Sequence, residues 1–239
     1  MDVDGLDPAA IVGRDGGVAV TGPIRVVLVD DQELFRAGIG IMIDAQPDME
    51  VVGSAADGAE GVRLVDELTP DVVLMDIRMP ELDGVEATRQ IFLPARAAGR
   101  TRPVRVVVLT TFNLDDRAAT AIRYGASGFL LKDATPAMLT DAIRTVHAGN
   151  AVLAPQDLSA LMEGQFRQRS PVPPGYEALT TKEQEIFALL AAGLSNSEVS
   201  ARLFLSESTI KTHVGAILRK LDLRDRVQIV VFAHEHGLI

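Results

Sequence analysis

From residue 24 onward, short runs of apolar and β-branched residues alternate with segments in which apolar residues recur at steps of three and four. The apolar runs lie at 24–29, 51–55, 72–75, 104–109 and 128–131. Strands that are short and almost wholly apolar are typical of a parallel sheet covered on both faces. The pattern therefore predicts an α/β domain with a doubly wound, parallel, five-stranded sheet.

Helical periodicity is clearest in two segments between or after the predicted strands. Apolar and small residues follow steps of three and four at Leu34, Ala37, Gly38, Ile41 and Ala45, and again at Leu139, Ala142, Ile143 and Val146. The second segment has Thr135 at its N-cap, Pro136 in its first turn and Gly149 just beyond its end. These signals predict that the first domain covers residues 24–148.

A stretch rich in proline, Ser170-Pro171-Val172-Pro173-Pro174-Gly175, interrupts helices and strands and marks an interdomain linker over 149–178. The chain beyond it, 179–239, is predicted to form a helical domain. Two helices there begin with capping boxes, at 180–183 and 195–198, in which a hydroxyl and a carboxylate satisfy backbone N–H groups. Gly193 is expected to close the first of these helices.

The net charge of −10 argues against a nucleic-acid partner until it is divided along the chain. Residues 1–23 carry −3, residues 24–148 carry −6, residues 149–178 carry −1, and residues 179–239 are neutral. Within that neutral part, residues 207–226 hold five Lys or Arg against three Asp or Glu. A local positive face that contacts phosphates is therefore compatible with the acidic composition.

Cysteine is absent, which excludes disulfides, zinc–thiolate sites and thiol nucleophiles. Residues 1–23 contain four Asp and five Gly and lack the basic and apolar regions of a signal peptide, so we expect a disordered N-terminal tail. No apolar run approaches the roughly 20 residues of a membrane-spanning helix. We expect a cytoplasmic protein without membrane contact.

Polar side chains stand at the carboxyl ends of the predicted strands. Asp30 and Asp31 follow the first strand, Asp76 the third, Thr110 the fourth and Lys132 the fifth. Ligands bind at this edge of a doubly wound sheet, so these side chains are expected to converge. Clustered carboxylates favour a hard divalent cation, and Mg²⁺ suits oxygen ligands that share it with a phosphate. The pattern predicts phosphoryl transfer to Asp76, with Mg²⁺ and Lys132 neutralising the phosphoryl oxygens.

Each of these residues, taken alone, is equally compatible with a cap of a helix or a turn. The combination favours the chemical interpretation, because the residues occur in the right order at four strand ends. Met79-Pro80 and Gly84 also supply the turn residues that the loop after Asp76 needs.

From Ile24 to about His147 these residues resemble the receiver domain of response regulators. The resemblance implies the flavodoxin-like strand order 2-1-3-4-5 and makes Asp76 the phosphoacceptor. It implies that Asp31 and Asp76 ligate Mg²⁺ directly, with Asp30 beside them and the backbone carbonyl of Arg78 as a further ligand. It also assigns three switch residues, Thr110, Phe129 and Lys132.

Two features depart from the receiver pattern. Phe129 stands where many family members have Tyr, which removes any contact that depends on the tyrosine hydroxyl. The connection 94–103 is richer in Arg and Ala than usual, and the sequence assigns it no role.

The last sixty residues have the spacing of a helix-turn-helix, with a third helix from Ser206 to Leu221. Its apolar stripe consists of Ile210, Val214, Ile217, Leu218 and Leu221, and its other face carries short polar groups and cations. Such a face suits the major groove of DNA. Periodicity alone favours a solvated amphipathic helix over a DNA-binding one.

Motifs favour the DNA-binding interpretation. Gly193-Leu194-Ser195-Asn196, the run 205–214 and Arg219-Lys220-Leu221 together resemble the LuxR-type helix-turn-helix. The resemblance implies DNA contacts from Ser208, Thr209, Lys211, Thr212, Gly215, Arg219 and Lys220, with Lys211 and Thr212 foremost. It also implies that Val227, Val230 and Val231 of the final helix pair across a dimer on DNA. His213, His234 and His236 have no metal-site spacing.

Both domains in this order resemble the NarL/FixJ family. We therefore expect a transcription factor, not an enzyme, that a partner histidine kinase phosphorylates on Asp76 and that binds double-stranded DNA as a homodimer. Two alternatives remain at this point. One is a regulator of the same fold that works without phosphorylation. The other is an aspartate-nucleophile phosphatase, which would require a second Asp where Arg78 stands.

Overall fold

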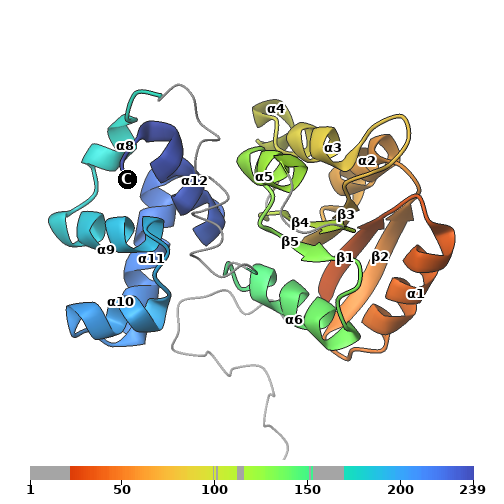
Figure 1. Ribbon diagram of the computed structural model, residues 1–239, viewed down its shortest axis with the longest axis horizontal. Coiled ribbons are helices and arrows are strands. Elements are labelled where there is room, and N and C mark those ends of the chain that lie inside the picture. Colours follow the sequence, from red (N-terminus) through yellow and green to blue (C-terminus); the bar gives the residue numbers. More distant parts are fainter. Residues whose placement is uncertain (1–21, 99, 101, 112–115, 151, 153–169) are drawn as a thin grey trace, which may run out of the picture.

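The structure is a computed structural model that describes residues 22–98, 100, 102–111, 116–150, 152 and 170–239. The predicted tail, apart from Gly22 and Pro23, and most of the predicted linker therefore lie outside the described residues. The described chain forms an α/β unit, a helical unit and a contact surface between them (Figure 1).

The first unit is built on one parallel sheet of five strands. Its strands are β1 (Ile24–Val29), β2 (Met49–Ala55), β3 (Val72–Asp76), β4 (Arg105–Thr110) and β5 (Gly128–Leu131). They lie in the order β2-β1-β3-β4-β5, and every pairing is parallel. The sheet confirms the predicted fold class and strand order. In its register Asp76 lies opposite Leu109 and Thr110 opposite Leu131, which places polar residues along one edge.

Helices cover both faces of this sheet. One face packs against α2 (Gly58–Leu68), α3 (Gly84–Ile91) and α5 (Asp116–Arg123), and the other packs against α1 (Glu33–Asp44) and α6 (Pro136–His147). Both cores consist mainly of Val, Ile, Leu and Ala, which explains why the strands are apolar at nearly every position. A short helix, α4 (Pro94–Ala97), begins the Arg-rich connection before β4.

The ends of α6 follow the sequence signals. Thr135 is the N-cap and accepts a hydrogen bond from the Met138 N–H, and Pro136 is the first helical residue. Gly149, just beyond the helix, has a φ of +80°, a conformation that favours glycine at the residue after a C-cap.

Helix α1 forms as predicted, but the apolar stripe on which the prediction rested faces solvent. Leu34 is 88% exposed and Ile41 is 74% exposed, whereas Ile39 and Ile43 are buried against the sheet. The sequence 33–44 has apolar residues on two faces, and each set satisfies steps of three and four. Periodicity therefore identified the helix without identifying its buried side.

The second unit contains five helices in the described part of the chain. They are α8 (Pro174–Glu177), α9 (Thr181–Ala191), α10 (Asn196–Leu203), α11 (Glu207–Leu221) and α12 (Arg226–His236). Both predicted capping boxes are present, and Gly193 follows α9 with a φ of +90°. Tyr176 packs on Phe187 with a centroid distance of 5.2 Å, so the end of the predicted linker contributes to this core.

Helix α12 is buried on two sides. Ile229, Phe232 and Ala233 belong to the core of the helical unit, whereas Val227, Val230 and Val231 belong to the core that also contains α3 and α5. A helix that is apolar on all sides is expected to be buried on all sides. Figure 1 shows α12 on the side of the helical unit that faces the α/β unit.

Candidate functional site

Three carboxylates meet at the carboxyl edge of the sheet. Asp30 directly follows β1, Asp31 comes next, and Asp76 is the last residue of β3. One oxygen from each lies within 4.8 Å of the others, and Asp30 and Asp76 are buried while Asp31 is exposed. The structure thus brings together the three acidic residues that the sequence predicted, with their oxygens close enough to share one cation.

Lys132, one residue beyond β5, reaches into the same cluster. Its Nζ lies 2.7 Å from Asp30 Oδ2 and 2.9 Å from Asp76 Oδ2. The Asp30 contact is an ion pair rather than a well-directed hydrogen bond, because Oδ2 accepts no hydrogen bond of good geometry. The other oxygens are held by backbone: Gln32 N–H donates to Asp30 Oδ1 and Arg78 N–H donates to Asp76 Oδ1.

The electrostatics of this cluster are unbalanced, since three carboxylates face one ammonium. Burial raises the pKa of the Asp76 carboxyl, Lys132 lowers it, and the neighbouring charge of Asp30 raises it again. Burial would lower the pKa of Lys132, but its contacts with Asp30 and Asp76 outweigh this effect, so the pKa is raised. Lys132 therefore stays charged, and the remaining negative charge suits a hard divalent cation with oxygen ligands.

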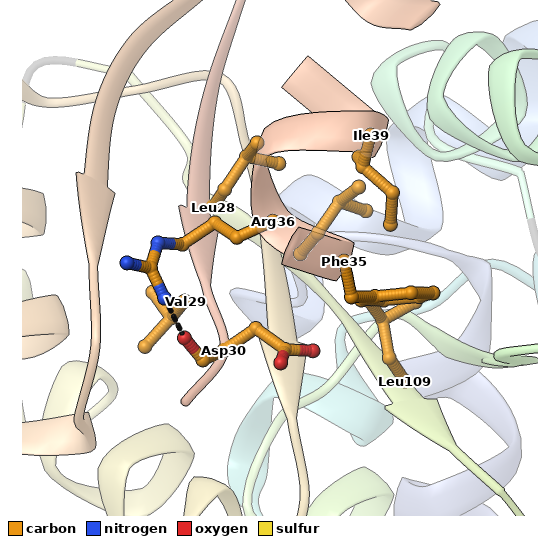
Figure 2. Close-up of a pocket in the computed structure, with 8 residues that line it drawn as sticks. Leu28, Val29, Asp30, Phe35, Arg36, Ile39 and Leu109 are labelled. Carbon is orange, nitrogen blue, oxygen red and sulfur yellow. Dashed lines mark hydrogen bonds between the residues drawn. The ribbon is translucent and has the colours of Figure 1, made fainter. Parts of the chain in front are cut away.

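The wall of the site beside Asp30 is apolar. Figure 2 shows Asp30 beside Phe35 and Leu109, with the Arg36 guanidinium donating a hydrogen bond to the Asp30 carbonyl. The Phe35 ring also lies 4.8 Å from Lys132 Nζ, which adds a cation–π contact to the two ion pairs. Phe35 was not among the site residues predicted from the sequence, although it lies four residues after Asp31, on the first turn of α1.

The loop after Asp76 depends on a close backbone approach at Gly84. A Cβ at this position would lie 1.9 Å from the Asp76 carbonyl oxygen, so no other residue fits without moving the strand end. The Gly84 N–H donates to the Ile77 carbonyl, and the Thr88 hydroxyl donates to the Gly84 carbonyl. The predicted turn residue therefore fixes the position of Asp76.

The predicted switch residues lie next to this cluster. Thr110 is buried at the end of β4, and its carbonyl accepts a hydrogen bond from the Lys132 N–H at 2.8 Å. Phe129 is 8% exposed and packs in the core that also contains α5 and α12. Its ring is thus already inside, and its role in a switch stays a prediction.

The predicted recognition helix α11 presents its polar face outward. Ser208, Lys211, Thr212 and Arg219 are exposed, whereas Ile210 and Ile217 are buried in the domain core. Val214, Leu218 and Leu221 pack against the same core. This division into an anchored stripe and a polar face is the one expected of a helix that enters the major groove.

Four residues of the predicted DNA-contacting set, Ser208, Thr209, Thr212 and Lys220, have local partners. Lys220 Nζ lies 2.5 Å from Glu183 Oε2, so its ammonium pairs with the capping box of α9. The Thr209 N–H donates to the Ser206 hydroxyl at the helix N-cap, and the Thr212 hydroxyl donates to the Ser208 carbonyl. Gly215 is half-buried. Lys211 and Arg219 are thus the cations of α11 that are exposed and form no ion pair with a carboxylate of the described residues.

The contact between the two units is centred on α12 and the residues before it. The Ser127 hydroxyl donates to Asp225 Oδ2 at 2.7 Å, and the Gln228 side chain donates to the Ala126 carbonyl. Arg224 donates to the Gly125 carbonyl and stacks on the Phe92 ring at 3.4 Å. Val227, Val230 and Val231, which the sequence analysis assigned to a dimer, face the α/β unit in this arrangement.

The chain matches two families of known proteins. Residues 26–144 match the response regulator receiver domain, and residues 177–233 match the bacterial regulatory proteins of the luxR family. The transcriptional regulatory protein LiaR of Bacillus subtilis (strain 168) is 41% identical over 216 residues, which are 90% of this chain and 99% of LiaR. The response regulator protein VraR of Staphylococcus aureus (strain NCTC 8325 / PS 47) is 38% identical over 218 residues, again 90% of this chain and 99% of VraR.

The chain belongs to the NarL/FixJ family of two-component response regulators. It spans nearly the whole length of its relatives LiaR and VraR, so the family assignment covers both domains. A solved LuxR-family two-component response regulator from Aurantimonas sp. SI85-9A1 is 35% identical and has a TM-score of 0.51, covering 60% of this chain and 99% of that one.

This response regulator combines a receiver domain with a LuxR-type helix-turn-helix, as the sequence predicted. Its relatives are transcriptional regulators, which agrees with a regulator and not with an aspartate-nucleophile phosphatase. Among the helices that the structure describes, none has the length and apolar character needed to cross a bilayer.

Proposed function

We propose that this response regulator accepts a phosphoryl group on Asp76 from a partner histidine kinase and then binds DNA as a homodimer. The observation that carries this proposal is the contact of Lys132 with both Asp30 and Asp76 at the carboxyl edge of the sheet. A buried carboxylate beside a fixed ammonium and two further carboxylates is suited to accept a phosphoryl group whose oxygens need cationic partners.

Asp30, Asp31 and Asp76, with the Arg78 backbone carbonyl, are the residues that would hold Mg²⁺. When bound, the cation supplies charge neutralisation for the incoming phosphoryl oxygens. The donor set fits, because it consists of oxygen atoms and two of the three carboxylates are buried. The Arg78 N–H donates a hydrogen bond to Asp76 Oδ1, and Gly84, which has no Cβ, leaves space for the Asp76 carbonyl. The carboxylate is therefore oriented before the phosphodonor arrives.

Phosphorylation of Asp76 would compete for Lys132, whose ammonium now bridges Asp30 and Asp76. A phosphoryl group also offers an acceptor for the hydroxyl of Thr110, which lies at the neighbouring strand end. Movement of Thr110 changes the packing beside Phe129, and Phe129 shares a core with α5 and α12. This chain of contacts supports a path from Asp76 to the interdomain surface.

The DNA-binding half of the proposal rests on α11 and α12. Lys211, Thr212 and Arg219 are exposed on α11 and are expected to contact base edges and phosphates. Val227, Val230 and Val231 are expected to pair in a dimer on DNA. These valines are buried against the receiver here, so dimerisation through α12 requires the two domains to separate first. That requirement supports control of DNA binding by phosphorylation.

Labelling with a small phosphodonor and Mg²⁺ tests the proposal. Intact-mass spectrometry should detect one acid-labile phosphoryl group on the wild type and none on Asp76→Asn, since an amide is a poor nucleophile. The exposed neighbour of Lys132 supplies a matched control, Asp133→Asn, which should be labelled normally. Equal labelling of Asp76→Asn and wild type would overturn the assignment, and Asp31→Ala should lose labelling if the metal site is correct.

A further inference from the structure

A cavity of about 830 Å³ lies between the receiver and the helix-turn-helix domain. Its walls come from the end of α3, the connection before β4, the end of α5 and residues 222–228. Four of its lining residues are arginines (Arg100, Arg102, Arg123 and Arg224), and one is acidic, Asp222. Arginines from both domains therefore face one space, in a chain that is acidic overall.

The Arg-rich connection supplies two of these side chains. Arg100 has one guanidinium nitrogen 2.9 Å from Asp66 Oδ1 and another on the Ile91 carbonyl, while its buried Nε has no acceptor among the described residues. The Arg102 side chain is half-exposed, and its Nη1 lies 4.0 Å from Asp71 Oδ1. Within the described residues, the contacts with Asp66, Ile91 and Asp71 leave donors of both guanidinium groups without an acceptor, which leaves capacity for an additional anion.

Arg224 enters the same cavity from the helix-turn-helix domain. Its Nη2 donates to the Gly125 carbonyl, its plane stacks on Phe92, and its buried Nη1 has no acceptor within the described part of the chain. Burial lowers the pKa of Arg224 to about 10, and repulsion from Arg100 and Arg105 adds to this effect while Asp225 opposes it. The group is still charged at neutral pH, so a buried cation faces other cations across the cavity.

We propose that this interdomain cavity binds a small phosphate-bearing compound of nucleotide size. Guanidinium groups match the geometry of phosphate oxygens and bind them with two hydrogen bonds at a time. The volume lies within the range of small-molecule sites, about 300–1,000 Å³. Tyr124, which is 39% exposed, adds an aromatic wall on which a base can stack.

A ligand that contacts Arg224 together with Arg102 or Arg123 joins the two domains. It stabilises the arrangement in which α12 packs against the receiver, because it binds that arrangement better than the separated one. The ligand is therefore expected to oppose DNA binding. This consequence rests on the proposed function, whereas binding to the cavity does not.

Isothermal titration of the full-length protein without Mg²⁺ tests the site, with inorganic pyrophosphate and ADP as probes. One probe molecule should bind per chain, and Arg102→Ala and Arg123→Ala should each weaken binding about tenfold or more, since each removes a charge-assisted contact. Arg63→Ala is the matched control, because Arg63 pairs with Glu67 on α2, away from the cavity, and should bind like the wild type.

The two probes distinguish the source of the phosphate. Tighter binding of ADP, lost in Tyr124→Ala, supports a nucleotide, and equal binding of both probes supports recognition of the phosphate groups alone. No binding at millimolar probe, or binding that both arginine variants leave unchanged, overturns the proposal.

Asp76→Asn should retain the affinity, which separates this site from the phosphorylation site. If the probe binds at the arginines but leaves DNA binding of the phosphorylated protein unchanged, the site stands and the regulatory consequence is wrong.

Discussion

Ser127 of the receiver and Asp225 of the helix-turn-helix domain are joined by a buried hydrogen bond of 2.7 Å, across 98 positions of sequence. Burial raises the pKa of the Asp225 carboxyl, against the opposite effects of Ser127 and Arg224. Asp225 also caps α12 by accepting from the Gln228 N–H. The Asp225 carboxylate therefore has two roles. It is the N-cap of α12, the helix that carries the predicted dimer residues, and it attaches α12 to the receiver.

Removing the hydroxyl at this contact should loosen the closed arrangement. Ser127→Ala leaves a buried carboxylate oxygen without its donor, which is expected to destabilise the interface by about 1–3 kcal/mol. The variant should be more extended in small-angle scattering and should bind DNA more tightly without phosphorylation. Thr120→Ala is the control, because the Thr120 hydroxyl bonds within α5. Unchanged scattering and DNA binding in Ser127→Ala would show that this bond does not hold the domains together.

The sheet, its strand order and the acidic cluster could be predicted from the sequence because each has a local signal. Apolar runs identify strands, and parallel topology brings Asp30, Asp76 and Lys132 to one edge whatever the details of packing. The capping boxes at Thr180 and Ser195 were equally local.

The interdomain contact could not be predicted, because no local pattern shows what covers an apolar helix. The sequence led us to assign Val227 and Val230 to a dimer surface, whereas in the structure these side chains pack on the receiver. The prediction of which face of α1 is buried was wrong for a related reason, because residues 33–44 are apolar on two sides. Only the packing against the sheet buries Ile39 and Ile43 and leaves Leu34 and Ile41 exposed. The contact of Arg224 with Gly125 joins residues 99 positions apart in the sequence, so no local pattern indicates it.

Gly84 should be essential to the position of Asp76. Gly84→Ala places a Cβ 1.9 Å from the Asp76 carbonyl oxygen, so the loop must shift, at a cost of about 1–3 kcal/mol in unfolding free energy. Labelling of Asp76 by the phosphodonor should also fall in this variant, because the shifted loop displaces Asp76. The matched control is Gly38→Ala, because nothing lies within 4 Å of the new Cβ. This variant should raise the unfolding free energy by about 0.5–1 kcal/mol, since alanine is favoured over glycine inside a helix. Chemical denaturation measures both, and equal stability of the two variants would contradict the close approach.

Lys132 should couple phosphorylation to DNA binding. Lys132→Ala removes the ammonium that lies within 3 Å of both Asp30 and Asp76, so the phosphorylated carboxylate loses its fixed cationic partner. The variant should still incorporate some label in Mg²⁺, but its DNA affinity should no longer rise on phosphorylation. Lys182→Ala, which breaks a surface pair with Glu185, is the control. A normal rise in DNA affinity for Lys132→Ala would show that this lysine is not part of the switch.

Acid should weaken the helix-turn-helix domain through Glu183. Its contact with Lys220, together with hydrogen bonds from Thr180, lowers the pKa of the Glu183 carboxyl to about 2. Because the folded-state pKa is depressed, the stabilisation is complete above the ordinary value near 4.5 and is lost as the pH falls toward 2. Glu183→Gln should therefore melt below the wild type at pH 7, and the difference should shrink by pH 3. A difference that does not change with pH would mean that the charge of Glu183 contributes nothing.

Lys211 and Val214 lie about one turn apart on α11, and substitutions at the two positions should have different effects. Lys211 is exposed, so Lys211→Ala should leave the melting temperature unchanged. If the ammonium contacts a base, the variant should lose about 1–3 kcal/mol of free energy of specific DNA binding. If it contacts a phosphate, the slope of the logarithm of the DNA-binding constant against the logarithm of salt concentration should fall in magnitude by about one. Val214 packs on the domain core, so Val214→Ala should lower the melting temperature.

The corresponding control for Lys211 is Lys182→Ala, which removes the same charge from α9, where the side chain pairs with Glu185. Titration of the phosphorylated protein onto an inverted-repeat DNA site at two salt concentrations separates the outcomes. If Lys211→Ala and Lys182→Ala bind alike, α11 does not present Lys211 to DNA. If phosphorylated wild type binds no better than unphosphorylated protein, the burial of Val227 and Val230 against the receiver does not limit dimerisation, because the interface would then open without the signal.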